Sequence, residues 1–544
     1  MKAIDLYSGV GGWSLGLRLA GIDVVASYEK WGAANETNFK NNHHPAQTVD
    51  IRRLDPSDLP QGIDFVVGSP PCTQFSYSNR GGNGDIDDGL KDIRCFLRVV
   101  DRLRPSGWVM ENVPRVADIL RTELRPEGAL AEFAHLPISI HVFNLEEFGL
   151  PQRRRRCFAG HFNHELLRTY QTRAPRLVME DVLDALAAEP VVDPIFGLSV
   201  PQNDLVDHHA EDFLDVEEER INRAAKEAHP VYNSMPFPDP RNRAVRTITA
   251  TCTRVSRESI VIDDPANSGK FRRLTVRERA ALQGFPITFQ FFGQSYGQKL
   301  KMIGNAVPPA FTYLLGHALL GTASDRLPSI GEAAAEVRTT DQRPPITRPD
   351  RSGRTFKADR TFRFAIPSLR LKSGVRFELA NAFTNGAASW IVRFVHGTSK
   401  DIRHLPLTEE LLERMSQTLL GSAHDEISSQ LDLLTKAIGK LDIPRMQQVW
   451  TRRGPGLTRP FMLLDLLDVF GSRLAVTMAD ERETAEALVI RVIASTGADR
   501  SPAPGIRKLI SAAPTVAAGL LVGSCANRTL CAGRDTANLW SETG

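Results

Sequence analysis

Short apolar runs that end in abrupt polar turns constrain the fold of this chain more than any other feature of its sequence. The run Phe65-Val66-Val67 is followed at once by Gly68-Ser69-Pro70-Pro71-Cys72. Such a run predicts a buried strand, and the Gly-Ser-Pro-Pro turn ends it. Because two prolines fix φ, Cys72 is expected on a stiff loop at the strand's carboxyl end, where open α/β sheets bind ligands. A lone thiol is more often an inert, buried cysteine, so Cys72 needs partners before it indicates a site.

Two other apolar runs end in a similar way. Ala3-Ile4-Asp5-Leu6-Tyr7 leads into Ser8-Gly9-Val10-Gly11-Gly12 and a helical pattern, and Trp108-Val109-Met110 leads into Glu111-Asn112-Val113-Pro114. A glycine-rich turn between strand and helix lets a ligand approach backbone N–H groups. A glutamate beside a cysteine in one crevice is a candidate pair for handling protons or hydrogen-bonding a substrate. Strand and helix patterns alternate over residues 1–165, which predicts a doubly wound α/β sheet.

Taken in order, these segments resemble the motifs of the DNA (cytosine-5)-methyltransferase family. The glycine-rich turn resembles its cofactor loop, Pro70-Pro71-Cys72 its nucleophile loop, and Glu111-Asn112-Val113 its base-binding motif. Three later segments continue the resemblance: Gln152-Arg153-Arg154-Arg155-Arg156, Arg273-Leu274-Thr275-Val276-Arg277-Glu278 with Leu282-Gln283-Gly284-Phe285-Pro286, and Gly304-Asn305-Ala306-Val307-Pro308-Pro309. Six ordered motifs are far more specific than one, and together they cover residues 1–322. The implied fold is the doubly wound sheet of an S-adenosylmethionine-dependent methyltransferase with a small target-recognition domain.

The resemblance implies a catalytic group of four side chains. Cys72 would attack carbon 6 of a cytosine, which makes carbon 5 nucleophilic toward the methyl group of S-adenosylmethionine. Glu111 would contact the base and stabilise charge that develops on its ring. Arg154 and Arg156 are the electropositive neighbours expected to favour the Cys72 thiolate. A stacked base cannot reach such a pocket, so the target cytosine must flip out of the duplex.

The same resemblance implies a set of cofactor contacts. Glu29 ends a strand-like run and should accept hydrogen bonds from the ribose hydroxyls. Tyr7 stands where the family usually has Phe, which keeps an aromatic surface. Lys30 precedes Trp31 where the family commonly has an apolar residue, so which of the two covers the adenine stays open. The full set of expected cofactor contacts is Tyr7, Ser8, Gly9, Gly11, Gly12, Glu29, Trp31, Asp50, Ile51, Pro70 and Asn305.

Residues 166–270 are the expected target-recognition domain, after which residues 271–322 return to the catalytic body. From position 241 to 279 there are ten Lys or Arg against four acids. A solvated basic face would explain this clustering, but contact with DNA phosphates is the favoured reading. The expected DNA contacts are Arg246, Thr247, Thr249, Arg254, Arg257 and Arg273.

Composition bounds the rest of the reading. A chain of 544 residues suggests two or three domains, and a net charge of +3 is too slight to announce nucleic acid by itself. The six cysteines show no paired CxxC spacing, which argues against a zinc site and for a reducing, cytoplasmic setting. The chain opens on a strand pattern without a secretory signal, and the small residues and Pro514 within 509–527 make a membrane span improbable.

The sequence beyond the motifs is less informative. Residues 323–353 are polar and proline-bearing without apolar periodicity, and are interpreted as a linker. A chain ending near Arg326 is therefore expected to fold. Residues 354–544 are predicted to form an accessory α+β domain, with strands near 362–366, 376–379 and 390–395 and helices over 408–441 behind Thr408 as N-cap. Binding of DNA or a partner is the default role, and a degenerate nuclease half is the sharper alternative.

Three classes of function stay open at this stage. The leading class is a monomeric DNA methyltransferase of prokaryotic or phage origin. Its expected partner is double-stranded DNA, and a restriction endonuclease that acts on the same DNA sequence is a candidate second partner. An RNA (tRNA) cytosine-5 methyltransferase shares the catalytic motifs. A non-catalytic DNA-binding relative is disfavoured because Cys72, Glu111 and the Arg154/Arg156 pair are all present.

Overall fold

The computed structural model divides the chain into two compact units. The first unit comprises Met1–Glu227 and Ser234–Ser352, and the second begins at Gly353. The structure describes residues 1–76, 84–227, 234–336, 340–371, 375–384, 386–398, 401–419, 422–494 and 504–532, so parts of the expected recognition domain, linker and accessory domain lie outside the described residues. Each unit is described by itself.

A seven-stranded sheet forms the centre of the first unit, in the order β3-β2-β1-β4-β5-β8-β6. Its strands are β1 (Lys2–Leu6), β2 (Asp23–Glu29), β3 (Ala46–Thr48), β4 (Phe65–Gly68), β5 (Gly107–Asn112), β6 (Ser139–Asn144) and β8 (Arg155–His161). The first five strands in this order run parallel, whereas β8 is antiparallel to both of its neighbours. Chain order reverses between β1 and β4, and such a switch point opens a ligand crevice at the strands' carboxyl ends.

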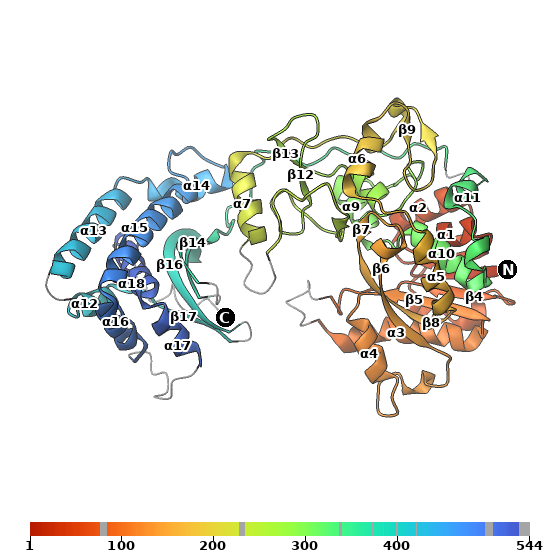
Figure 1. Cartoon of the computed structure of the whole chain (residues 1–544), viewed down its shortest axis with the longest axis horizontal. Helices are drawn as coiled ribbons and strands as arrows, with labels where there is room; N and C mark the ends of the chain where they lie inside the picture. Colours follow the sequence, from red (N-terminus) through yellow and green to blue (C-terminus); the bar gives the residue numbers. More distant parts are fainter. Residues whose placement is uncertain are drawn as a thin grey trace. The chain divides into compact units, whose positions relative to one another are not determined.

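Helices cover both faces of this sheet, which confirms the doubly wound fold (Figure 1). Trp13 and Leu17 pack with Phe311 on one face, while Phe96 and Leu120 belong to the core of the other. The first face is covered by α1 (Gly12–Leu19), α5 (His164–Thr169) and α10 (Pro309–Leu320), and the second by α3 (Ile86–Leu103) and α4 (Val116–Glu123). Helix α2 (Gly32–Asn42) follows β2.

The rest of the first unit is built from short elements that share a core with the catalytic body. One hydrophobic cluster joins Leu15 of α1 to Ile262, Leu282 and Ile303. The strands are β7 (Gln152–Arg153), β9 (Val191–Val192), β10 (Ser199–Val200), β11 (Val245–Arg246), β12 (Val261–Asp263) and β13 (Phe271–Arg273). The helices are α6 (Met179–Ala187), α7 (Val216–Glu227), α8 (Val276–Leu282), α9 (Tyr296–Asn305) and α11 (Ile330–Glu336).

Residues 323–353 were expected to form a linker, and the structure corrects this expectation. Most of the segment packs onto the first unit. Helix α11 lies within it and buries Ala334 in the shared core. Lys299 Nζ donates to the carbonyl of Pro345 at 2.8 Å, and Arg273 Nη2 lies 2.9 Å from a carboxylate oxygen of Asp350. Buried cations need hydrogen-bond acceptors, and this extended segment supplies acceptors to Lys299 and Arg273. The segment has no apolar periodicity, so its packing could not be predicted from the sequence pattern. A chain ending at Arg326 would lose these partners.

The second unit is an α+β domain, as expected. Its antiparallel sheet has the order β14-β15-β16-β17, with β14 (Arg363–Arg370), β15 (Arg376–Thr384), β16 (Ala387–Thr398) and β17 (Asp401–Leu405). The helices are α12 (Glu409–Ser416), α13 (Ser422–Ile438), α14 (Ile443–Thr451), α15 (Pro460–Asp480), α16 (Arg482–Ala494), α17 (Pro504–Ser511) and α18 (Ala513–Leu530). Thr408 caps α12 as predicted, since its Oγ1 accepts from the Leu411 N–H at 3.2 Å.

Glycines let the long helices of the second unit approach its sheet closely. A Cβ at Gly519 of α18 would stand 2.1 Å from the Phe377 ring, and Asn527 bonds both backbone polar groups of Val392. This close packing explains why the apolar run near 509–527 is buried in protein. Among the helices that the structure describes, none combines the length and apolar character that crossing a membrane requires.

Candidate active site

The Cys72 loop follows β4 and is tied to the carboxyl end of β5, whose last two residues are Glu111 and Asn112. Asn112 Nδ2 donates to the carbonyl of Pro70 at 3.0 Å, and Trp13 Nε1 donates to Ser69 Oγ at 3.0 Å. The carbonyl of Cys72 accepts the N–H groups of Phe75 and Ser76, both at 3.0 Å, which closes a tight turn. These bonds fix the backbone on both sides of the thiol. Cys72 itself is partly exposed.

Glu111 and Arg156 form an ion pair beside this loop. Their Oε1 and Nε atoms lie 3.1 Å apart, with side chains only 9% and 15% exposed. The antiparallel register of β5 and β8, which pairs Glu111 with Phe158, brings the two side chains to one edge of the sheet. Because little solvent reaches the two side chains, water screens the attraction between their charges only weakly.

The electrostatic surroundings of Cys72 differ from the sequence expectation. The positive charges of Arg156 and Arg154 do lower the pKa of the thiol, but burial and the Glu111 charge raise it. Burial is the largest effect, so the pKa of Cys72 is raised overall. The two arginines therefore lower the free-energy cost of forming the Cys72 thiolate, but they do not offset the effect of burial.

Arg154 has a role that its motif did not reveal. Its guanidinium is buried and donates to three backbone carbonyls: those of Ile248 at 3.3 Å, Gly304 at 3.2 Å and Ala306 at 3.0 Å. Burial lowers the pKa of Arg154 to about 9. The side chain joins the catalytic strand to two segments that lie far along the chain. Gln152 adds to this joint, since its Oε1 accepts the Ile248 N–H at 3.0 Å.

The glycine-rich turn after β1 is open where a ligand would need space. Gly9 has φ +53°, and no described atom lies within 4 Å of the position that a Cβ would take. Gly12 is closely packed instead, because a Cβ there would stand 2.1 Å from the Val307 carbonyl oxygen. The buried Ser8 Oγ has no hydrogen-bond partner among the described residues. Glu29 accepts the N–H groups of Gly9 at 3.0 Å and Trp31 at 2.7 Å, which closes the turn against β2.

Tyr7, Arg52 and Asp92 form a polar group next to this turn. Tyr7 is held at φ 54°, a left-handed conformation that non-glycine residues rarely adopt. Its Oη donates to the Asp92 carbonyl at 3.1 Å, a bond that the family's usual Phe could not make. Arg52 binds both carboxylate oxygens of Asp92 at 3.0 and 2.6 Å. Sequence reasoning missed Arg52 and Asp92, although a partly buried phenol in place of Phe is a signal that a partner must exist.

The remaining expected cofactor contacts lie around the same crevice. Ile51 is buried, and Asp50 caps the short turn after it by accepting the Arg52 N–H at 3.1 Å. Lys30 is exposed, whereas Trp31 is partly buried and has Lys301 Nζ 4.9 Å from its ring centroid. Asn305 is exposed at the end of α9.

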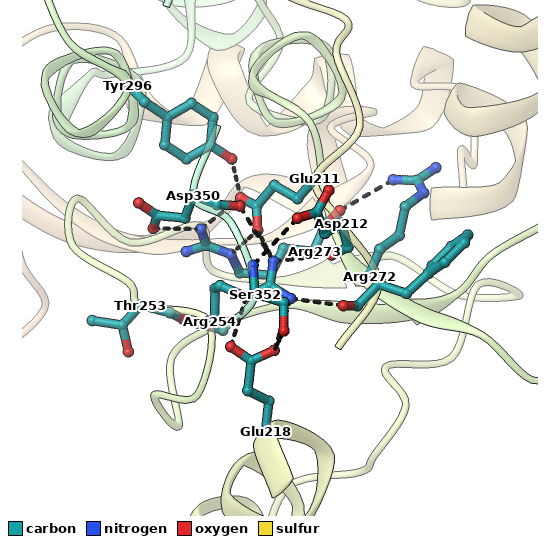
Figure 2. A network of polar contacts seen from close by, with 12 residues as sticks. Glu211, Asp212, Glu218, Thr253, Arg254, Arg272, Arg273, Tyr296, Asp350 and Ser352 are labelled. Atoms are coloured by element: carbon teal, nitrogen blue, oxygen red, sulfur yellow. Dashed lines mark hydrogen bonds and ion pairs between the residues drawn. The ribbon is translucent and has the colours of Figure 1, made fainter. Parts of the chain in front are cut away.

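Four of the expected DNA-contacting arginines are occupied inside the protein, which corrects that expectation. Arg246 pairs with Asp239 at 2.7 Å, and the buried Arg257 donates to the carbonyls of Ala225 and Lys226. Arg254 and Arg273 are buried in ion pairs (Figure 2). Acidic residues between 207 and 239 fold against the basic segment, so the buried guanidiniums of Arg254, Arg257 and Arg273 are not available to phosphates. Arg246 is paired but partly exposed. Thr247 and Thr249 are partly exposed and stay candidates.

The doubly wound sheet carries the predicted motifs at the carboxyl ends of its strands, and comparison with known proteins gives the family. The chain matches the C-5 cytosine-specific DNA methylase family over residues 1–320 and belongs to it. The Type II methyltransferase M.HgiDI of Herpetosiphon aurantiacus is 28% identical over 327 residues, which cover 59% of this chain and 94% of that protein. For M.NgoPII of Neisseria gonorrhoeae the identity is 27% over 346 residues, covering 59% and 96%. The solved methyltransferase EhMeth of Entamoeba histolytica is 15% identical with a TM-score of 0.43, over 59% and 98%.

Proposed function

We propose that this protein transfers the methyl group of S-adenosylmethionine to carbon 5 of a flipped-out cytosine within a specific DNA sequence. The observation that carries this proposal is the joining of the Cys72 loop to the Glu111–Arg156 ion pair at the switch point of the sheet. Family membership over residues 1–320 supports DNA as the substrate. The resemblance of the chain to Type II methyltransferases favours a restriction–modification role, with an endonuclease of the same target as the expected partner.

The residues around the glycine-rich turn fit S-adenosylmethionine. Each carboxylate oxygen of Glu29 keeps a lone pair for a ribose hydroxyl beyond the backbone N–H that it already accepts. The unpartnered Ser8 Oγ and the open space over Gly9 suit a ligand that brings its own polar groups. Trp31 would offer an aromatic face for the adenine, and Asp50, Ile51 and Asn305 are the further expected contacts of the cofactor. When bound, the cofactor supplies an electrophilic methyl group.

In the proposed reaction, the Cys72 thiolate adds to carbon 6 of the cytosine, and the electron pair of the 5,6 double bond becomes available at carbon 5. Glu111 holds the ring by a charge-assisted hydrogen bond, and Arg156 keeps the Glu111 carboxylate in place. After carbon 5 has taken the methyl group, loss of its proton restores the double bond and expels Cys72. Because burial raises the pKa of Cys72, the thiolate forms in the course of the reaction, and the positive charge of Arg156 is what favours it.

A covalent trap tests this proposal. Wild-type protein with S-adenosylmethionine and duplex DNA containing 5-fluorocytosine should give a complex that survives denaturation, because fluorine cannot leave as the proton does. Cys72→Ser should give neither this complex nor methylated DNA, while binding S-adenosylmethionine like wild type. Cys531→Ser, a change in the second unit, is the matched control and should behave like wild type. Normal turnover by Cys72→Ser would refute the mechanism, and methylation of RNA but not DNA would refute the substrate.

A further inference from the structure

A segment beyond the family-matched region enters a buried charge cluster of the first unit. We call Glu211, Glu218, Arg254, Arg273 and Asp350 the Glu211 cluster (Figure 2). The first four belong to residues 1–320, which match the family, whereas Asp350 lies 30 residues past the end of that match. This chain therefore completes the cluster with a residue from its own extension.

Two arginines and two glutamates make up the inner part of the Glu211 cluster. Arg273 binds Glu211 through Nε at 2.8 Å and Nη2 at 2.5 Å, and Arg254 binds Glu218 through Nε at 2.9 Å and Nη2 at 2.8 Å. Arg254 Nη1 also reaches Glu211 at 3.2 Å, and Tyr296 Oη donates to the same carboxylate. The buried charges of these four side chains already balance. Charge neutrality of the cluster therefore does not require Asp350.

Asp350 and Ser352 add contacts that fix where the two arginines point. The Asp350 carboxylate lies 2.9 Å from Arg273 Nη2, and its backbone carbonyl accepts from Arg254 Nη1 at 3.4 Å. Ser352 Oγ bonds the carboxylates of Asp215 at 3.0 Å and Glu218 at 3.2 Å at the start of α7. The segment thus bridges both arginines and the acidic helix start that holds them.

The same arginines hold one end of the loop that carries the candidate DNA contacts. We call residues 247–254 the recognition loop. At its first end, Arg154 and Gln152 of the active site hold Ile248 by its carbonyl and its N–H. At its other end Arg254 is inserted into the Glu211 cluster, and Arg273 donates to the Cys252 carbonyl at 3.0 Å. The stretch between these anchors exposes Thr251 and Thr253 to solvent.

We propose that Asp350 and Ser352 are positioning residues for target recognition: they fix the Arg254 and Arg273 anchor and thereby the conformation in which the recognition loop meets DNA. The proposal rests on the function proposed above. A loop held at both ends loses less conformational entropy when it binds, so loosening one anchor weakens binding without changing the catalytic groups. The extension that leads to the second unit is in this way part of the recognition apparatus.

Full-length variants test the proposal. Asp350→Asn removes the carboxylate charge that faces Arg273, and Ser352→Ala removes the hydroxyl that bonds α7. The matched control is Asp204→Asn, which breaks the ion pair of Asp204 with Arg343 at 3.0 Å. Arg343 lies in the same extension as Asp350 and Ser352, but both side chains of this pair are exposed. Amide hydrogen exchange over the recognition loop, residues 247–254, and steady-state methylation of DNA are measured for all four proteins.

Faster exchange over the recognition loop is expected in Asp350→Asn and Ser352→Ala, but not in the control. The KM for target DNA should rise roughly threefold to thirtyfold, while kcat and the affinity for S-adenosylmethionine stay near wild type. Unchanged exchange and KM would overturn the proposal, as would a fall of kcat, DNA binding and cofactor binding together, which indicates general destabilisation. If the wild type methylated no DNA, the proposed function would fail, but the exchange measurement would still decide whether these residues hold the loop.

Discussion

Replacing Arg154 by lysine separates an anchoring role from a catalytic one. Its Nη1 and Nη2 atoms reach three backbone carbonyls, on Ile248, Gly304 and Ala306. A lysine has one compact nitrogen, which cannot span carbonyls that two separate guanidinium nitrogens reach. At least one hydrogen bond from a charged donor is lost and a buried carbonyl is left unpaired, so the unfolding free energy of the first unit should fall by about 2–4 kcal/mol.

Arg156→Lys is the matched comparison, because it changes the neighbouring arginine of the same motif. Arg156 makes an ion pair with Glu111 that lysine can partly keep, and its side chain is 15% exposed. Because the charge is kept and no set of backbone carbonyls depends on Arg156, we expect a smaller loss of stability than for Arg154→Lys, but a clear loss of methyl transfer. Urea unfolding followed by tryptophan fluorescence, together with transfer of labelled methyl groups to DNA, measures both quantities. Equal destabilisation by the two variants, or an Arg154→Lys protein that is stable yet inactive, would refute the anchoring role.

Three further predictions follow from the same geometry. Glu111→Gln should lower methyl transfer by roughly 2.7–4 kcal/mol of transition-state stabilisation, by analogy with loss of one oxyanion donor, and leave cofactor affinity unchanged; equal losses in both would mean that Glu111 is misassigned. Burial raises the pKa of Cys72 while Arg156 lowers it, so alkylation of Cys72 by iodoacetamide should accelerate as the pH rises into the alkaline range. Arg156→Gln should slow this alkylation at each pH. Faster alkylation in this variant would contradict the charge argument. A chain ending at Ser352 should unfold at the same urea concentration as the first unit of the full protein. A chain ending at Arg326 lacks Asp350 and the Pro345 carbonyl and should unfold at a lower urea concentration. Identical unfolding midpoints of the two truncated chains would support the linker interpretation instead.

Local sequence patterns determined the catalytic sheet and most of its crevice. Strand, turn and helix are short-range properties, so the apolar runs before Ser8, Pro70 and Glu111 each predicted a strand that the structure contains, although β5 continues through Glu111 to Asn112. The α+β character of the second unit and the Thr408 cap followed from the same kind of pattern. These features depend on residues within one turn or one strand of each other, and they can therefore be predicted from the sequence.

Tertiary structure decided which charges are free and which segments belong together. Arg254 and Arg273 find Glu211 at separations of 43 and 62 residues, and Arg154 finds the Gly304 carbonyl 150 residues away. A basic cluster in the sequence gives no sign of the acids that will fold against it, since pairing depends on long-range packing and burial. The same holds for residues 345–352: their composition is that of a linker, and only the buried cations that they meet make them part of the first unit.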